Sequence, residues 1–351
     1  MKRLLIALFC ILTLPVFANE PAATTAEATQ EEAFNPGEMI LHHIGDSHEW
    51  HWFSTDNGHF VAPLPIIAYR PGKGVSIFSS ARLAEGQTYD GLKLEHEHLV
   101  TEDGSKVYDF SITKNAAALL GSGLILLVVF MAVARGYKKN HGKAPTGIQS
   151  FFEPIIIFIR DEVAKKSIGP KYERYMPYLL TVFFFIWFNN LLGLTPGAAN
   201  LTGNIAVTFT LAILTLIITL ASSNKYYWAH IFATPGVPKA LLPIMIPVEL
   251  IGVVVKPFSL MIRLFANITA GHIVILSFIS LIFIFKNVAL APVSLAFGLF
   301  INVLELLVAI LQAYIFTLLT AMYIGGAVEE HHDADYQMGG GDGAEDAHAA
   351  H

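Results

Sequence analysis

The feature that most constrains the fold is a long apolar stretch in the C-terminal third of the chain. Between residues 241 and 328 charged side chains are few, and one of them, Arg263, stands in the middle of the stretch. A hydrocarbon core is spanned by roughly 20 apolar residues, so the stretch is long enough for two membrane helices. A cation at membrane depth costs roughly 2.5–3.5 kcal/mol or more, which makes Arg263 a candidate functional residue. Alternatively, its side chain reaches an interface or pairs silently with Glu249 or Glu305.

Composition supports a membrane protein and excludes other classes. Hydrophobic residues make up 54% of the chain and charged residues only 14%, against roughly 25% charged residues in soluble domains. The net charge of −6 is spread over tails and loops, so we expect no nucleic-acid partner. The single cysteine, Cys10, lies in the leader, which excludes disulfides and thiolate metal sites from the mature chain.

Four segments follow one another along the chain. An apolar run behind Lys2 predicts a secretory signal peptide over residues 1–18. Residues 19–113 are polar and interrupted by turns, which indicates a small β-rich extracytoplasmic domain. Residues 114–328 form a membrane domain, and the Gly/Ala/Asp-rich residues 329–351 form a disordered cytoplasmic tail.

The extracytoplasmic segment begins with a disordered stretch at about residues 19–33 and then shows strand signals. Asp56-Asn57-Gly58 is typical of a hairpin turn. Pro71–Gly74 turns Ile66–Tyr69 back onto Val75–Phe78, and Val107–Thr113 reads as a strand that leads into the first membrane helix.

Histidines are frequent in this segment and in the tail. They have no cysteine partners and no standard spacing, so we expect exposed histidines and no metal site. These residues are His42, His43, His48, His51, His59, His96, His98, His331, His332, His348 and His351.

The fold class predicted for the rest is an all-α polytopic membrane protein with five membrane helices. The basic residues that follow the first helix place its C-terminal end in the cytoplasm, and hence the N-terminal domain outside and the C-terminus inside. An amphipathic helix over Ile148–Lys166 is expected to lie along the cytoplasmic interface. The expected spans are Ala116–Ala134, Pro177–Leu194, Asn204–Ser222, Pro247–Phe285 and Ala291–Val328.

The last two of these helices are too long for perpendicular spans. At 1.5 Å per residue each would reach about 55 Å, so both must be steeply tilted or bent. Pro257 should bend the first of them, since it removes a backbone donor. The connection before it should be broken by Pro235, Pro238, Pro243 and Pro247.

Helical periodicity orders the polar groups of these two helices. Glu249, Lys256 and Arg263 recur every seven residues and therefore share one face, with Asn267 about 40° from Arg263 and His272 about 180° away. On the last helix Glu305 and Gln312 are also seven apart, and Asn302, Thr320 and Tyr323 lie within about 60° of Glu305. A purely apolar packing surface would not need such faces.

Three blocks of sequence resemble one known family. They are Pro247–His272 (PVELIGVVVKPFSLMIRLFANITAGH), Leu304–Phe316 and Phe151–Gly197. In order and spacing these blocks resemble subunit a of the F-type ATP synthase, the stator protein that carries protons past the rotating c-ring. The resemblance covers about residues 114–328 and includes neither the first hundred residues nor the tail.

The resemblance implies a tilted helical hairpin laid against the c-ring in a bacterial cell inner membrane. It implies subunit b of the stator stalk, the F1 sector and membrane lipid as further partners, and no cofactor. The chain has no nucleotide-binding loop of the G-x-x-x-x-G-K-S/T type. We therefore expect no catalytic site in this chain, with ATP chemistry in partner chains.

The resemblance also implies roles by position. Arg263 matches the family's essential arginine, and Asn267 and Gln312 match its polar neighbours. His272 and Glu305 match an acid–base pair of the extracytoplasmic half-channel, whose two residue types are exchanged in some members. Glu249 is assigned to the cytoplasmic half-channel, and Lys256, Asn190, Asn204 and Asn302 are secondary polar candidates.

Several alternatives remain open. Asn267 and Gln312 could serve only as hydrogen-bond partners between helices. Lys256 could be a snorkelling anchor, and Asn190 and Asn204 could be helix-end groups. A secondary ion transporter that acts without a rotary partner would also bury Arg, Glu and His, although the chain shows no internal repeat. A membrane-tethered sensor would place its function in residues 19–113.

Overall fold

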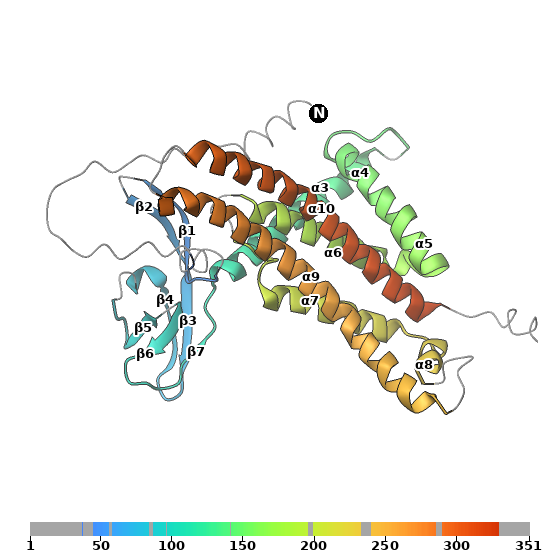
Figure 1. Ribbon diagram of the computed structural model, residues 1–351, viewed down its shortest axis with the longest axis horizontal. Coiled ribbons are helices and arrows are strands. Elements are labelled where there is room, and N and C mark those ends of the chain that lie inside the picture. The colour runs from blue at the N-terminus through green and yellow to red at the C-terminus, as the bar shows by residue number, and fades with distance from the viewer. Residues whose placement is uncertain are drawn as a thin grey trace, which may run out of the picture.

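The computed structural model describes residue 37 and residues 45–55, 58–83, 87–95, 97–140, 142–195, 199–232, 240–285 and 290–329. The predicted signal peptide, the disordered start and nearly all of the tail lie outside these described residues. The described chain has a small β region followed by a much larger set of long helices (Figure 1). Five helical segments are long and apolar enough to cross a membrane, which confirms the predicted fold class.

The β region contains three small sheets. Strands β1 (Glu49–Thr55) and β2 (Gly58–Pro63) form a hairpin, and β3 (Pro65–Arg70) pairs with β4 (Gly74–Ser79) and β7 (Tyr108–Asp109). The two predicted hairpins are confirmed. A third, formed by β5 (Leu92–Glu95) and β6 (His98–Thr101), was not predicted.

The strand predicted over Val107–Thr113 is wrong in length. Only Tyr108 and Asp109 form β7, although Phe110 and Ile112 still donate backbone hydrogen bonds to Ile67 and Pro65. The strand cannot run farther because Thr113 is the N-cap of the next helix, and its side chain accepts from the backbone of Ala116.

A core of its own stabilises the β region. This core contains side chains of β3, β4, β5 and β6. It also contains Leu83, which directly follows the 3₁₀ turn η1 (Ser80–Arg82). Burial of this kind is worth about 25 cal/mol per Å² of apolar surface. The core residues are Ile66, Ala68, Phe78, Leu83, Leu92 and Leu99.

Two ion pairs fasten the edges of this core. Buried Arg70 contacts Asp90, and a hydrogen bond from Ser76 together with the Arg70 charge lowers the pKa of Asp90 against the opposing effect of burial. His48, also buried, lies 2.8 Å from Asp109. Burial raises the pKa of Asp109, but hydrogen bonds from Ser111 and His48 outweigh it and lower the pKa overall.

The helical part begins with α3 (Lys114–Lys139). Helix α4 (Ile148–Phe158), a π-helical segment η3 (Ile159–Ala164) and α5 (Lys165–Ile168) continue one another, and a 3₁₀ turn η4 (Gly169–Lys171) leads into α6 (Tyr172–Gly193). Then follow α7 (Ile205–Ser222), α8 (Lys225–Phe232), α9 (Leu242–Phe285) and α10 (Ala291–Val328).

Two helices begin five residues before the expected membrane spans that they contain. Helix α6 begins at Tyr172, before the span expected from Pro177, and α9 begins at Leu242, so the helix start predicted at Pro247 is wrong. In each helix the proline lies in the second turn, so only one early intrahelical bond is lost. The connection before α9, which prolines were predicted to break, contains α8. Its last two prolines, Pro243 and Pro247, lie in the first turns of α9.

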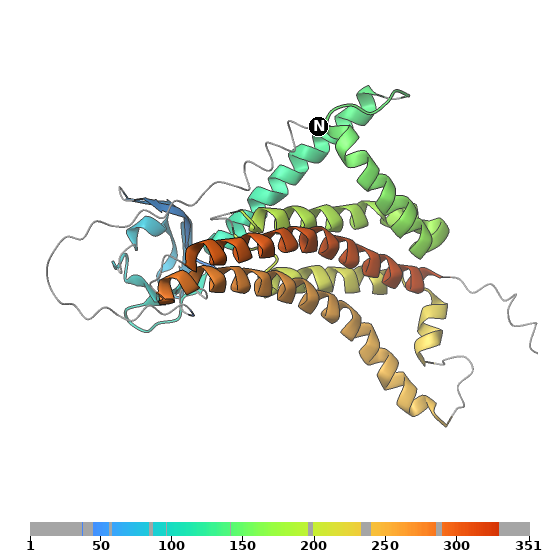
Figure 2. The same ribbon diagram turned by 45° about the horizontal axis from the view of Figure 1, so that its top comes forward.

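The last two helices are too long for perpendicular spans, as the sequence predicted, and α9 is five residues longer than predicted. With 44 and 38 residues, α9 and α10 reach about 66 and 57 Å, well beyond a hydrocarbon core of about 30 Å. Figure 2 shows α9 bent along its length, as the position of Pro257 inside it predicts.

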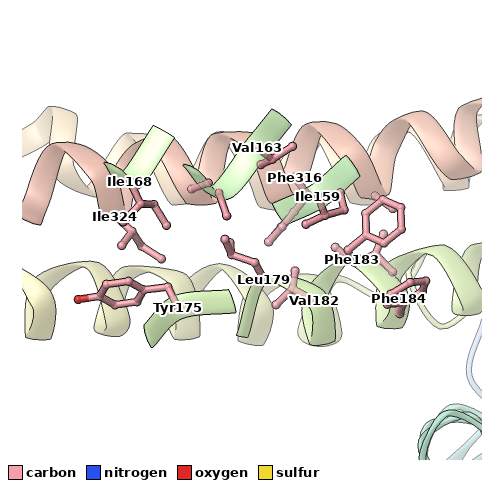
Figure 3. Close-up of a cluster of buried hydrophobic side chains, with 14 of the residues drawn as sticks. Ile159, Val163, Ile168, Tyr175, Leu179, Val182, Phe183, Phe184, Phe316 and Ile324 are labelled. Atoms are coloured by element: carbon pink, nitrogen blue, oxygen red, sulfur yellow. The ribbon is translucent and has the colours of Figure 1, made fainter. Parts of the chain in front are cut away.

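A single large core holds α6, α10 and the α4–α5 segment together. Figure 3 shows apolar side chains of these elements pointing toward one another. Gly325 permits the closest approach, because a Cβ atom there would lie 1.9 Å from the carbonyl oxygen of Ser167. The core residues labelled in the figure are Ile159, Val163, Ile168, Tyr175, Leu179, Val182, Phe183, Phe184, Phe316 and Ile324.

Candidate functional site

Helices α9 and α10 lie antiparallel and side by side in both views, and they carry most of the predicted site residues (Figures 1 and 2). The hairpin brings residues about 30 to 45 positions apart in sequence into contact. Two polar pairs cross between the helices, and each joins one predicted residue of α9 to one of α10.

The first pair is His272 and Glu305. Nδ1 of His272 lies 2.9 Å from Oε1 of Glu305, and Nε2 of the same ring lies 3.1 Å from the carbonyl oxygen of Gly193. A carbonyl oxygen can only accept, so Nε2 must carry a hydrogen. The bond between Nδ1 and Oε1 therefore needs a second proton, shared between the imidazole and the carboxyl group.

Glu305 is deeply buried, with 4% of its surface exposed. Its second oxygen, Oε2, has no hydrogen-bond partner among the described residues. The hydroxyl oxygens of Thr269 on α9 and Thr320 on α10 are also buried and unpartnered in this part of the chain. Buried polar atoms normally have a partner, and water is the group that most often supplies one inside a protein.

Gly271 makes the contact between His272 and Glu305 sterically possible. A Cβ atom at this position would lie 2.6 Å from Oε1 and 2.8 Å from Cδ of Glu305. A glycine inside a helix costs about 1 kcal/mol relative to alanine. The close approach of the Glu305 carboxyl group gives this glycine a packing reason.

The second pair is Asn267 and Gln312. The side-chain nitrogen of Asn267 donates to Oε1 of Gln312 over 3.1 Å. Gln312 is buried and Asn267 is exposed, so the bond runs from the interior of the hairpin to its surface. Asn267 thus lies one turn from Arg263 on α9, and its hydrogen bond adds the amide group of Gln312 from α10.

Arg263 is exposed on α9 and makes no hydrogen bond or ion pair with any residue that the structure describes. Tyr323 on α10 is the group close enough to interact with it electrostatically. The guanidinium group keeps its charge at all physiological pH values. It is therefore free to meet an anionic partner outside this chain.

Glu249 and Lys256 lie on α9 toward its N-terminal end, near a small cavity of about 80 Å³. Lys256 lines this cavity with Tyr227 of α8 and Tyr323 of α10, and its ammonium group lies 5.9 Å from the centre of the Tyr323 ring. Burial raises the pKa of Tyr227, and the negative charge of Glu249 raises it further.

The remaining candidates have mainly local contacts. Asn190 is buried, donates to the carbonyl oxygen of Ala309 over 3.2 Å and accepts from Thr202. Asn204 is the N-cap of α7. Asn302 is half-buried and has no hydrogen bond within the described part of the chain.

Sequence reasoning missed three contributors to the site. The carbonyl of Gly193 leaves no sequence signal, because every residue has a carbonyl group. Gly271 could have been found as an isolated glycine inside a helix, which suggests close packing. Tyr227 was missed because α8 is short and was taken for a connection. Within the described ranges, no group of three or more His, Cys, Asp or Glu side chains is placed to hold a metal ion.

The fold and these contacts define a polytopic α-helical membrane protein with ionisable groups on its candidate membrane helices. A family model described as ATP synthase A chain matches residues 117–325. A second, described as a domain of unknown function (DUF8433), matches residues 39–119. The chain belongs to the ATP synthase A chain family.

Similar proteins carry names from the same family. ATP synthase subunit a of Chloroherpeton thalassium is 50% identical over 234 residues, which cover 64% of this chain and 70% of the relative. ATP synthase subunit a 2 of Chlorobaculum tepidum is 39% identical over 330 residues, 91% of this chain and 82% of the relative. ATP synthase subunit a of an Anaeromyxobacter species is 38% identical over 328 residues, 89% and 75% of the two chains.

Proposed function

We propose that this chain is the proton-translocating stator subunit of the Fo sector of an F-type ATP synthase. Family membership and the names of the relatives support the assignment. The observation that carries it is Arg263, a cation without a partner in the described chain, beside polar pairs that cross between α9 and α10. The partners are the c-ring, subunit b of the stalk and the F1 sector.

Arg263 would face the c-ring and act on a carboxylate of that ring. It cannot relay a proton, because an arginine guanidinium stays protonated throughout the physiological pH range. It can keep a passing carboxylate ionised and block a direct proton path between the two sides of the membrane. A ring carboxylate would pass Arg263 after it loses its proton to one half-channel. It would then take a proton from the other half-channel and return through lipid in the neutral form.

The two half-channels would open on opposite sides of Arg263. We assign His272 and Glu305 to the extracytoplasmic half-channel, because their shared proton and the unpartnered oxygen of Glu305 suit proton exchange with water. Glu249 belongs to the cytoplasmic half-channel, with the cavity at Lys256 beside it. Asn267 and Gln312 would hold the polar surface next to Arg263.

The orientation follows from loop charge. Arg135, Lys138, Lys139 and Lys143 follow the apolar part of α3, so this end would be cytoplasmic and the β region extracytoplasmic. The protein would be a multi-pass protein of the bacterial inner membrane, with its C-terminus in the cytoplasm. ATP chemistry would take place in partner chains.

Proton pumping driven by ATP in inverted membrane vesicles tests the proposal. We expect Arg263→Ala to abolish pumping while blotting shows that the c-subunit is still assembled. Arg135→Ala is the matched control, because Arg135 is an exposed arginine at the end of α3, and it should pump like the wild type. Undiminished pumping by Arg263→Ala would favour an ion transporter that acts without a rotary partner.

A further inference from the structure

One face of the sheet β4-β3-β7 is apolar and uncovered. Ile77 and Val75 of β4 are 70% and 61% exposed, and Phe110, which follows β7, is 66% exposed. Tyr69 of β3 lies opposite Val75 on one side and Tyr108 of β7 on the other, with the two tyrosine rings 6.2 Å apart. These five side chains form one continuous surface, which we call the aromatic face.

Such a surface needs an explanation, because strands with one solvated face usually alternate apolar and polar residues. The opposite face of the same strands carries Ile66, Ala68 and Phe78, which pack on β5 and β6 in the core of the β region. Both faces of β3 and β4 are therefore apolar, and only one is covered. Contiguous exposed apolar patches commonly mark interaction sites.

The direction of the aromatic face follows from the arrangement of the sheets. Figure 1 shows β5 and β6 on the side of β3 that is farther from the helices. The core lies between them, so the aromatic face is turned the other way, toward the end of the helical bundle. In the same figure β3 runs across the direction of the long helices.

Hydrogen bonds fix the segment before β1 to the start of the first membrane helix. The backbone N–H of Lys114 donates to the carbonyl of Ser47 over 2.8 Å, and that of Asn115 donates to Asp46 over 3.0 Å. Pairing between β7 and β3 continues through Phe110. The family model that covers residues 39–119 likewise spans both the β region and the start of α3.

The length of α3 relates the aromatic face to the membrane surface. Helix α3 has 26 residues and is about 39 Å long, so it extends beyond a hydrocarbon core of about 30 Å. Phe110 precedes its first residue by four positions, at most about 13 Å of extended chain. Exposed leucines such as Leu119 and Leu120 continue the apolar surface along α3 into the membrane.

We propose that the aromatic face docks on the phospholipid surface at the N-terminal end of α3 and holds the β region against the membrane. Tyrosine and phenylalanine suit the boundary between headgroups and acyl chains, where one end of a ring is apolar and the other wet. Acidic residues outnumber basic ones in the described β region. Docking therefore depends on apolar burial and does not need anionic lipid.

Site-specific fluorescence in the assembled complex tests this. In a Cys10→Ser background, which removes the only native cysteine, Ile77→Cys is labelled with an environment-sensitive fluorophore. The matched control is Glu95→Cys, since Glu95 is 52% exposed on β5 in the other layer. Both complexes are reconstituted in phosphatidylcholine vesicles and quenched with iodide in the water or with nitroxide-labelled phospholipid.

We expect the label at residue 77 to have blue-shifted emission, stronger quenching by the nitroxide lipid and weaker quenching by iodide than the label at residue 95. Equal iodide quenching at the two positions would show that the face is open to water and would overturn the proposal. Shielding of residue 77 from both quenchers would overturn it too, in favour of a protein partner over the sheet.

Discussion

Gly271→Ala tests the proton-sharing pair most sharply, because the substitution adds one methyl group at a known place. The new Cβ atom would lie 2.6 Å from Oε1 of Glu305, whereas ordinary contacts begin at 3.4 Å. The carboxyl group must therefore move by about 0.8 Å. We expect it to move away from Nδ1 of His272, which would lengthen the bond, now 2.9 Å long, beyond hydrogen-bonding distance.

The expected loss follows from the energy of that bond. A buried hydrogen bond to a charged group is worth about 1.5–3 kcal/mol, and each 1.36 kcal/mol is about tenfold in rate. If the shared proton is used in translocation, ATP-driven pumping by Gly271→Ala should fall by about 10-fold to 150-fold. Gly123→Ala is the control, because a Cβ atom there meets nothing within 4 Å. Pumping at the wild-type rate by an assembled Gly271→Ala complex would refute the reasoning.

Three further outcomes are expected. Gly325→Ala should lower the free energy of unfolding of the solubilised complex by about 1–3 kcal/mol or more, because the new Cβ atom would overlap the Ser167 carbonyl. The adjacent Gly326→Ala is the control and should leave the stability unchanged, because Gly326 has open space around it. Asn267→Ala and Gln312→Ala should show a coupling of about 0.6 kcal/mol in a double-mutant cycle on thermal unfolding, and strict additivity would rule out their hydrogen bond. The pKa of Asp109 is lowered in the fold, so Asp109→Asn should destabilise the β region at pH 6. The difference in stability between Asp109→Asn and the wild type should disappear as the pH falls below about 4 and through the folded-state pKa of Asp109. A difference in thermal midpoint that does not change with pH would contradict a lowered pKa of Asp109.

The membrane helices could be predicted from sequence because a bilayer imposes a simple requirement. Every spanning segment needs about 20 apolar residues and must satisfy its backbone internally. The bounds predicted for the last helix, Ala291–Val328, agree with α10. The start of α9 was misplaced because Pro247 was taken as a break, although a proline in the second turn leaves the helix intact.

The β region was harder to predict. The β5–β6 hairpin has short strands, LKLE and HLVT, with mixed polar and apolar residues, and its pairing depends on packing against β3 and β4. Strand preference of this kind is decided by neighbours in space, which local sequence does not reveal. The uncovered apolar face of the same sheet became apparent only when the strand register was known.

The candidate site was only partly predictable. Helical periodicity could group Glu249, Lys256 and Arg263, because a seven-residue spacing returns to the same face. The contact between His272 and Glu305 was expected from the family resemblance, and periodicity alone gave no distance between the two helices. The second acceptor of His272, the carbonyl of Gly193, is a backbone atom of another helix and has no counterpart in the sequence pattern.

Passive proton conduction tests most directly whether Arg263 separates two proton paths. Vesicles are stripped of the F1 sector, and the proton flux driven by an imposed pH gradient is measured for wild type and Arg263→Ala with equal c-subunit content. We expect Arg263→Ala, although it cannot pump, to conduct protons passively, because the barrier between the half-channels is gone. Normal ATP-driven pumping by the variant, or a membrane as tight as one without the Fo sector, would show that Arg263 does not separate the two paths.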